Sequence, residues 1–287
     1  MKTSTEIASV ARITGEERAI ELIAKAGFDA WDFSMFSMCR YDWENRRMLE
    51  NDHPLAGNNY LAFAKKLKKT GLDNGIHCNQ SHAPFPTSCA DIRSYLKRAI
   101  ECTAEAGGEI CIIHPDNNKN HEENAQMYLE LLPFAKEHNV KIATENMWNW
   151  DNEKGHSSFA ACATPESFCA HIDEVNDEYF VACLDIGHAE MKGSQTSAVQ
   201  MIKALGNRLQ SLHIHDNDKL HDSHQIPFSM DIDFVSVVSA LKEIKYSGYF
   251  TLEADAYLEK YSVENVVEGV KNLAGSAKRL ACMYEEF

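Results

Sequence analysis

Six residues that can bind a metal ion each follow a short apolar run of this 287-residue sequence. They are His82, His114, Glu145, Asp185, His213 and Glu253. The runs before them cover residues 75–81, 109–113, 140–144, 180–184, 209–212 and 249–252, and each has the length and composition of a β-strand. One strand that ends in a carboxylate or an imidazole means little. Six in succession, each followed by a helical pattern, would converge on one rim of a closed parallel barrel, so the sequence predicts a metal site there.

The two glutamates at strand ends indicate what such a site would bind. Glu145 and Glu253 each end an apolar run, and a buried carboxylate without a partner is very costly. A divalent cation between them would meet that need. Together with Asp185 and His213 they form an oxygen-rich ligand set. We expect manganese, with magnesium, cobalt and zinc as alternatives.

Strand and helix patterns alternate along the whole chain, which favours an α/β fold with a parallel sheet. Two further strands are predicted at 6–10 and 30–34, and helices at 15–25, 164–172, 231–244 and 263–283. The order predicts a single (β/α)8 TIM barrel, one domain that spans residues 1–287. A doubly wound open sheet is the alternative, but no glycine-rich phosphate fingerprint follows any predicted strand. The longer connections 40–59, 146–163 and 216–230 would be loops on the catalytic face.

The charge balance limits the partners of the predicted site. The chain has 28 Lys plus Arg against 43 Asp plus Glu, a net charge of −15. This charge gives an unfavourable long-range field for nucleic acid or an anionic membrane, so we expect neither as a partner. A neutral small molecule is the easier ligand. Neither an apolar leader nor a run long enough to span a bilayer is seen, and we expect a cytoplasmic protein.

Histidines and aspartates also cluster outside the strand ends. Asp185 and His188 lie three residues apart, which fits a site, although the carboxylate could instead cap the next helix with an incidental histidine. His213 and His215 would share one face only if the strand continues through both, and we expect one of them to point inward. Asp222 and His224 form another pair, either in a solvated loop or folded back over the rim.

The order of these short motifs resembles that of the xylose-isomerase-like barrel superfamily, which includes sugar phosphate isomerases and epimerases and metal-dependent apurinic endonucleases. The resemblance covers essentially the whole chain. Its motifs are Ser81-His82-Ala83-Pro84, Ile113-His114-Pro115, Thr144-Glu145-Asn146, Leu184-Asp185-Ile186-Gly187-His188, His213-Ile214-His215-Asp216-Asn217, Asp222-Ser223-His224 and Leu252-Glu253. One departure is Phe228-Ser229-Met230, which stands where the family usually has a glycine-rich turn.

The resemblance implies roles for individual residues. In the ketose epimerases of the family, residues that match Glu145, Asp185, His213 and Glu253 hold a single metal ion. The residue that matches His188 contacts the substrate. In the endonuclease branch, residues that match His82, His114, Asp222 and His224 also bind metal, in a multi-zinc cluster. Asp222 and His224 are therefore candidates for an additional metal ion, and the number of ligands does not separate the two branches. Barrels of this group are often dimers or tetramers, so a homo-oligomer is also expected.

We expect a metal-dependent isomerase or epimerase that acts on a ketose or keto-polyol. Glu145 and Glu253 would exchange a proton with the carbon next to a metal-chelated carbonyl. The candidate substrate contacts are His188, His82, His114, Trp148 and Lys219, of which Lys219 could equally be an exposed loop residue. The alternatives are a lyase or dehydratase, or a C-glycoside-cleaving subunit, on sugar substrates; a multi-zinc phosphodiesterase like the apurinic endonucleases; and a barrel that only binds a sugar or metal.

Overall fold

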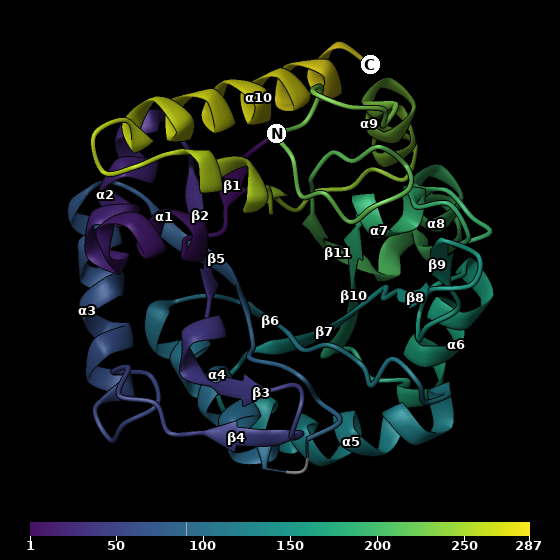
Figure 1. Cartoon of the computed structure of the whole chain (residues 1–287), viewed down its shortest axis with the longest axis horizontal. Coiled ribbons are helices and arrows are strands. Elements are labelled where there is room, and N and C mark those ends of the chain that lie inside the picture. Colours follow the sequence, from purple (N-terminus) through teal and green to yellow (C-terminus); the bar gives the residue numbers. More distant parts are fainter. Residues whose placement is uncertain (90) are drawn as a thin grey trace.

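The computed structural model describes residues 1–89 and 91–287, and it forms a closed parallel barrel ringed by helices (Figure 1). The barrel strands are β1 (Thr3–Thr5), β2 (Ala30–Ser34), β5 (His77–His82), β6 (Ile110–Ile112), β7 (Lys141–Glu145), β10 (Phe180–Asp185), β11 (Leu209–His213) and β12 (Phe250–Leu252). One sheet has the order β11-β10-β7-β6-β5-β2, and β1 pairs with β12. Single parallel bridges, Glu6 to Asp32 and Ile214 to Leu252, join the two sheets. These bridges close the ring and confirm the predicted TIM barrel.

Helices follow the strands around the outside of the barrel. They are α1 (Ala8–Thr14), α2 (Glu16–Ala26), α3 (Tyr60–Asp73), α4 (Ile92–Ala106), α5 (His121–Glu137), α6 (Pro165–Val175), α7 (Ile186–Glu190), α8 (Ala198–Leu205), α9 (Phe234–Glu243) and α10 (Val266–Glu286). Capping residues mark an end of two of these helices. Thr164 accepts a hydrogen bond from the backbone of Ser167 at the start of α6, and Gly27, with a φ of 99°, ends α2. Within the described ranges, no helix is both long and apolar enough to cross a bilayer.

The first strand was predicted in the wrong place. The structure puts β1 at Thr3–Thr5, and the residues from Ala8 onward form α1. The apolar residues Ile7 and Val10 suggested a strand, but they belong to the hydrophobic shell between barrel and helices. The true strand is polar because its side chains meet polar partners inside the barrel. Hydrophobic patterning could not locate such a strand.

A polar layer fills part of the barrel interior below the rim. Gln80 accepts hydrogen bonds from the hydroxyls of Ser211 (2.7 Å) and Thr251 (3.3 Å), and its amide donates to Asp32 Oδ2 at 2.8 Å. The hydroxyl of Ser4 donates to a neighbouring asparagine of β5 at 2.6 Å. Barrel interiors are usually filled by branched apolar residues. Here buried polar groups satisfy one another instead, and they hold side chains that point up toward the rim.

Two hairpins extend from the carboxyl-terminal side of the barrel. β3 (Arg40–Asp42) pairs with β4 (Arg47–Leu49), and β8 (Asn149–Asp151) pairs with β9 (His156–Ser158), both antiparallel. They occupy two of the long connections that follow β2 and β7, and Figure 1 shows them beside different parts of the ring. Each connection therefore has internal hydrogen bonding of its own.

The first prediction concerns Glu6, a buried carboxylate just after β1. Glu6 accepts hydrogen bonds from the backbone and hydroxyl of Ser9 and from the hydroxyl of Ser34. Burial raises the pKa of Glu6 from 4.5 to about 7, although the Ser9 hydrogen bonds oppose the rise. Because the folded protein binds this proton more tightly than the unfolded chain, the free energy of unfolding falls as pH rises from about 4.5 to about 7.

Replacing Glu6 by glutamine, which carries no charge, should remove this contribution. At pH 8, Glu6→Gln should unfold at a higher urea concentration than wild type, with a free energy of unfolding larger by on the order of 1–3 kcal/mol. At pH 5 little of that gain should remain. Urea unfolding of both proteins at the two pH values measures the difference. The same difference at both pH values would contradict the prediction.

Candidate metal centre

Four side chains at the carboxyl ends of β7, β10, β11 and β12 lie close enough to share one metal ion. We call them the first group: Glu145, Asp185, His213 and Glu253, whose ligand atoms all lie within 4.8 Å of one another. The Nδ1 atom of His213 is 3.0 Å from Glu145 Oε1 and 3.0 Å from Glu253 Oε2. All four residues are buried. They come from strands that meet at one rim, so the barrel itself sets their distances.

The first group fits a divalent cation on its own geometry. In the described part of the chain, Glu145 Oε2 and Asp185 Oδ2 are buried without a hydrogen-bond partner. Buried carboxylate oxygens that lack a partner are costly, and a bound cation would satisfy them. Three carboxylates and one imidazole suit manganese, magnesium or cobalt better than a thiolate-selecting ion.

Asp185 has two tasks, because each of its oxygens faces a different group. Its Oδ1 accepts a hydrogen bond from the backbone of His188 at 2.7 Å, so it caps α7 as the sequence allowed. The side chain of Asn146 clamps its backbone, donating to the Asp185 carbonyl at 2.9 Å and accepting from its amide at 2.8 Å. The cap leaves Oδ2 for the first group. The helix cap that the sequence allowed is therefore present, and it leaves Asp185 able to face the first group as well.

The two glutamates differ in proton affinity. Burial raises the pKa of Glu145, but the imidazole of His213 and hydrogen bonds with neighbouring histidines outweigh it and hold that pKa well below 4.5. Burial also raises the pKa of Glu253, and there the charge of Glu145 adds to the rise while His213 opposes it. One carboxylate is therefore held ionised while the other takes up a proton more readily.

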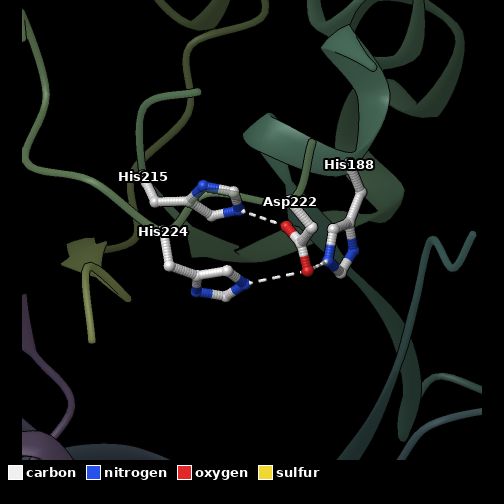
Figure 2. A group of neighbouring side chains, drawn as sticks. All are labelled: His188, His215, Asp222 and His224. Carbon is white, nitrogen blue, oxygen red and sulfur yellow. Dashed lines mark hydrogen bonds and ion pairs between the residues drawn. The ribbon is translucent and has the colours of Figure 1, made fainter. Parts of the chain in front are cut away.

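A second group lies beside the first and is drawn in Figure 2: His188, His215, Asp222 and His224. The three imidazoles surround the Asp222 carboxylate (Figure 2). The Nε2 atom of His224 is 3.2 Å from Asp222 Oδ2, that of His188 is 3.4 Å from Oδ2, and that of His215 is 3.4 Å from Oδ1. His215 also approaches Asp185 Oδ1 at 3.1 Å, so the two groups are in direct contact.

Backbone carbonyls hold the Nδ1 atoms of two imidazoles of the second group. Nδ1 of His188 faces the carbonyl of Asn146, and Nδ1 of His224 faces the carbonyl of Glu253, each at 2.8 Å. A backbone carbonyl at one nitrogen fixes the tautomer and leaves the other nitrogen for a cation, as is common for metal-binding histidines. Burial lowers the pKa of His188, but Asp185 and Asp222 outweigh it and raise the pKa to about 10. Three imidazoles and a carboxylate suit zinc.

A third group joins His82 and His114 to Glu145. Their Nε2 atoms are 2.8 Å apart and lie 3.6 Å and 3.3 Å from Glu145 Oε2. Burial and the neighbouring His82 lower the pKa of His114 to about 4. Two imidazoles that face a carboxylate could hold a further metal ion or a substrate hydroxyl. The structure thus brings together every strand-end residue that the sequence singled out.

A pocket of about 620 Å³ opens above these groups. Of the first group, Glu145 and Glu253 line the pocket, whereas Asp185 and His213 lie beneath it. The aromatic side chains of its wall are Phe36, Trp43, Phe85 and Trp148. Among the described residues that line it, none is a lysine or an arginine. The pocket is therefore acidic and aromatic, which suits a neutral polar ligand better than a phosphorylated one.

Two of the proposed substrate contacts have different positions. Trp148 lines the pocket, and its indole N–H donates to Asp222 Oδ2 at 3.2 Å. Lys219 does not line the pocket; its ammonium lies 3.4 Å from Glu190 Oε2. The alternative of a surface loop lysine describes its position better. His188, His82 and His114 do line the pocket.

Sequence reasoning missed residues that the structure places at the site. His213 and His215 are both buried and both turn toward the ligand groups, although only one was expected to do so. Their alternate spacing was the available signal. Gly187 makes room for His215, because a Cβ at that position would overlap the imidazole. Asp32, inside β2, also approaches His213 of the first group.

Asp216 shapes the connection that carries Asp222 and His224. The backbone amides of Ser229 and Met230 donate to Asp216 Oδ2 at 3.0 and 2.9 Å. Phe228 has a φ of 71°, a conformation more usual for glycine. The chain therefore makes the turn without the glycine-rich segment typical of the family. A buried carboxylate supplies the acceptors that hold this loop.

The fold agrees with comparisons to known proteins. The chain belongs to the xylose isomerase-like TIM barrel family, whose model matches residues 20–276. A solved D-tagatose 3-epimerase-like protein superimposes with a TM-score of 0.71 at 22% identity, over 100% of this chain and 97% of that one. A solved L-ribulose 3-epimerase gives a TM-score of 0.69 at 16% identity, over 100% and 95%.

Sequence relatives are distant but span most of the chain. An uncharacterised protein of Methanocaldococcus jannaschii is 24% identical over 91% of this chain and 88% of its own. An L-ribulose 3-epimerase of Methylomonas sp. strain DH-1 is 21% identical over 84% of this chain and 78% of its own. At these identities the solved structures establish the fold.

The second prediction is that divalent metal stabilises the protein through the first group. Adding Mn²⁺ to EDTA-treated protein should raise the thermal midpoint, because an ion that binds only the folded state adds about 2.7 kcal/mol at a hundred times its Kd. Asp185→Asn should lose most of this gain. Asp173→Asn, which removes an exposed aspartate paired with Arg208, is the matched control and should keep the gain. Equal gains in both variants would argue against the site.

Proposed function

We propose that the protein is a metal-dependent sugar isomerase or epimerase that acts on a ketose or keto-polyol. The main support for the proposal is that only two of the four residues of the first group line the pocket. Asp185 and His213 lie below the pocket floor, while Glu145 and Glu253 reach the pocket. Two ligands can thus fix an ion while two carboxylates also meet a substrate.

The two glutamates are placed to act on one carbon from different sides. Glu145 ends β7 and Glu253 follows β12, which lie three strand positions apart around the barrel. A cation held here would polarise the substrate carbonyl and so acidify the adjacent C–H bond. One glutamate would remove the proton, and the other would deliver its own proton to the opposite face of the same carbon, which inverts that carbon. If the proton is instead delivered to the former carbonyl carbon, and the proton of the neighbouring hydroxyl passes to the former carbonyl oxygen, the product is an isomer with a shifted carbonyl.

Pocket residues would orient the substrate. His188, His82 and His114 line the pocket, and their Nε2 atoms can bind substrate hydroxyls. Trp148 offers an apolar face against the sugar ring, held in place by its bond to Asp222. Restricting the substrate in this way keeps the reacting carbon between the two glutamates.

Proteins of similar structure support the proposal of an isomerase or epimerase. The solved structures include a D-tagatose 3-epimerase-like protein, an L-ribulose 3-epimerase and a 3-keto-D-glucoside 4-epimerase of E. coli. The last has a TM-score of 0.68 at 14% identity. Ketoses and keto-sugars share a carbonyl beside an acidic C–H bond, the chemistry that the first group suits. Elimination of water by the same deprotonation is the lyase alternative.

A second candidate function is a multi-zinc phosphodiesterase. It is favoured by the second and third groups, which add imidazoles around Asp222 and Glu145 and could hold additional ions. Asp222 and His224 would be ligands in that case. Against it stand the net charge of −15 and the acidic pocket wall, since phosphates of nucleic acid require a basic track. We therefore rank it below the isomerase.

The third prediction tests the proposed reaction. Protein loaded with Mn²⁺ and incubated in D₂O with a panel of free ketoses should place deuterium on the carbon next to the carbonyl of its substrate, detectable by NMR. Glu145→Gln and Glu253→Gln should each slow this exchange by about 10²- to 10⁴-fold. The matched control is Glu190→Gln, a partly buried glutamate that does not line the pocket.

The outcomes separate the candidates. Deuterium in an epimer or isomer supports the proposal, and deuterium in a dehydrated product supports the lyase alternative. Absence of exchange in every ketose, together with several zinc ions per chain and cleavage of abasic DNA, would replace the proposal by the phosphodiesterase. Loss of exchange in Glu190→Gln as large as in Glu145→Gln would show that the glutamates of the pocket have no special role.

A further inference from the structure

His213 has two ring nitrogens in different surroundings. Its Nδ1 faces the carboxylates of Glu145 and Glu253 and is the atom that would bind a metal. Its Nε2 points away from them into the barrel and has no hydrogen-bond partner among the described residues. A metal-bound neutral imidazole carries its proton on the other nitrogen. That N–H, buried below the rim, needs an acceptor.

Asp32 is the carboxylate that lies at this nitrogen. Its Oδ2 is 3.5 Å from His213 Nε2, and its side chain is fully buried inside β2. No backbone N–H or cation satisfies it: in the described chain Oδ1 has no hydrogen-bond partner, and Oδ2 accepts only from the amide of Gln80, at 2.8 Å. A buried carboxylate with so few partners is costly unless a further donor pairs with it.

The polar layer fixes the direction of Asp32. Gln80 lies opposite Asp32 in the register of β2 and β5, and its carbonyl end is held by Ser211 and Thr251. The amide end of Gln80 is therefore turned toward Asp32. This arrangement brings the carboxylate beneath the imidazole from a strand on the far side of the barrel interior.

We propose that Asp32 is a positioning residue that accepts the Nε2–H of His213, completing a carboxylate–imidazole–metal relay below the first group. The inference rests on the metal site of the proposed function. Asp32 does not touch the substrate; it selects the tautomer of His213, orients its ring and makes Nδ1 a stronger ligand. Gln80 keeps Asp32 in place from the other side.

Glu6 provides a matched control for this role. It is also a buried carboxylate, at the end of the neighbouring strand, and its bridge partner is Asp32 itself. Its side chain contacts the hydroxyls of Ser9 and Ser34 and no imidazole. A general effect of removing buried charge from the barrel would appear in both variants, whereas the relay predicts an effect only at Asp32.

The fourth prediction compares the Mn²⁺ affinity of the metal-stripped proteins by isothermal titration calorimetry. Asp32→Asn should raise the Kd by about 10- to 100-fold, as changes to such partners of metal ligands do. Glu6→Gln should leave the Kd unchanged. The thermal midpoint of unloaded Asp32→Asn is measured alongside, so that loss of folding is not mistaken for loss of affinity.

A second measurement needs no variant. In the wild type loaded with Zn²⁺, which is diamagnetic, ¹⁵N NMR of the histidine side chains should show His213 as the Nε2–H tautomer with a slowly exchanging, strongly downfield proton. The opposite tautomer overturns the proposal, as does an unchanged Kd in Asp32→Asn or an equal loss in Glu6→Gln. If metal binding weakens in Asp32→Asn as expected and His213 has the Nε2–H tautomer, but no ketose exchanges deuterium, the role of Asp32 stands and the proposed function fails. If the wild type binds no divalent metal, both fail.

Discussion

The burial of many ionisable side chains at one end of the barrel is the constraint on which the rest of the structure depends. Carboxylates there cannot be hydrated, so each must meet an imidazole, a backbone amide or a cation. Glu145 meets histidines on two sides, Asp185 caps a helix, and Asp216 receives the amides of a loop. Apart from Trp31 Nε1 and Arg93 Nη1, the unpaired buried side-chain atoms of the described chain belong to residues at or just below this centre. Carboxylate oxygens without a partner therefore lie where a cation can bind them.

That constraint extends down into the barrel. An apolar interior would leave the buried carboxyl group of Asp32 without a hydrogen-bond donor. The hydroxyls and amides around Gln80 form a connected layer instead, and the register of β2 against β5 places its amide at the carboxylate. The layer makes the barrel interior part of the site rather than a passive support.

The sequence predicted the barrel and the meeting of the first group at one rim, because the carboxyl ends of parallel strands converge there whatever the details of packing. Glu145, Asp185 and Glu253 were found by this rule alone. Asp32 was not, because it sits within a strand and its importance depends on register. β1 was misplaced because its residues face polar partners, so the apolar pattern of Ile7 and Val10 was the stronger signal. The position of Lys219 outside the pocket was not predicted, because a loop lysine has no fixed direction until the loop folds.

The two hairpins at the mouth of the pocket have a consequence for divergence within the family. β3–β4 and β8–β9 are hydrogen-bonded within themselves and enter the ring after different strands. Trp43, in the turn between β3 and β4, can therefore be exchanged without disturbing strand register or ligand geometry. Trp148 is different, because its indole N–H donates to Asp222 of the second group. Replacement of the β3–β4 hairpin would thus change the pocket wall and leave the residues at the strand ends in place, whereas a change at Trp148 would reach the second group as well.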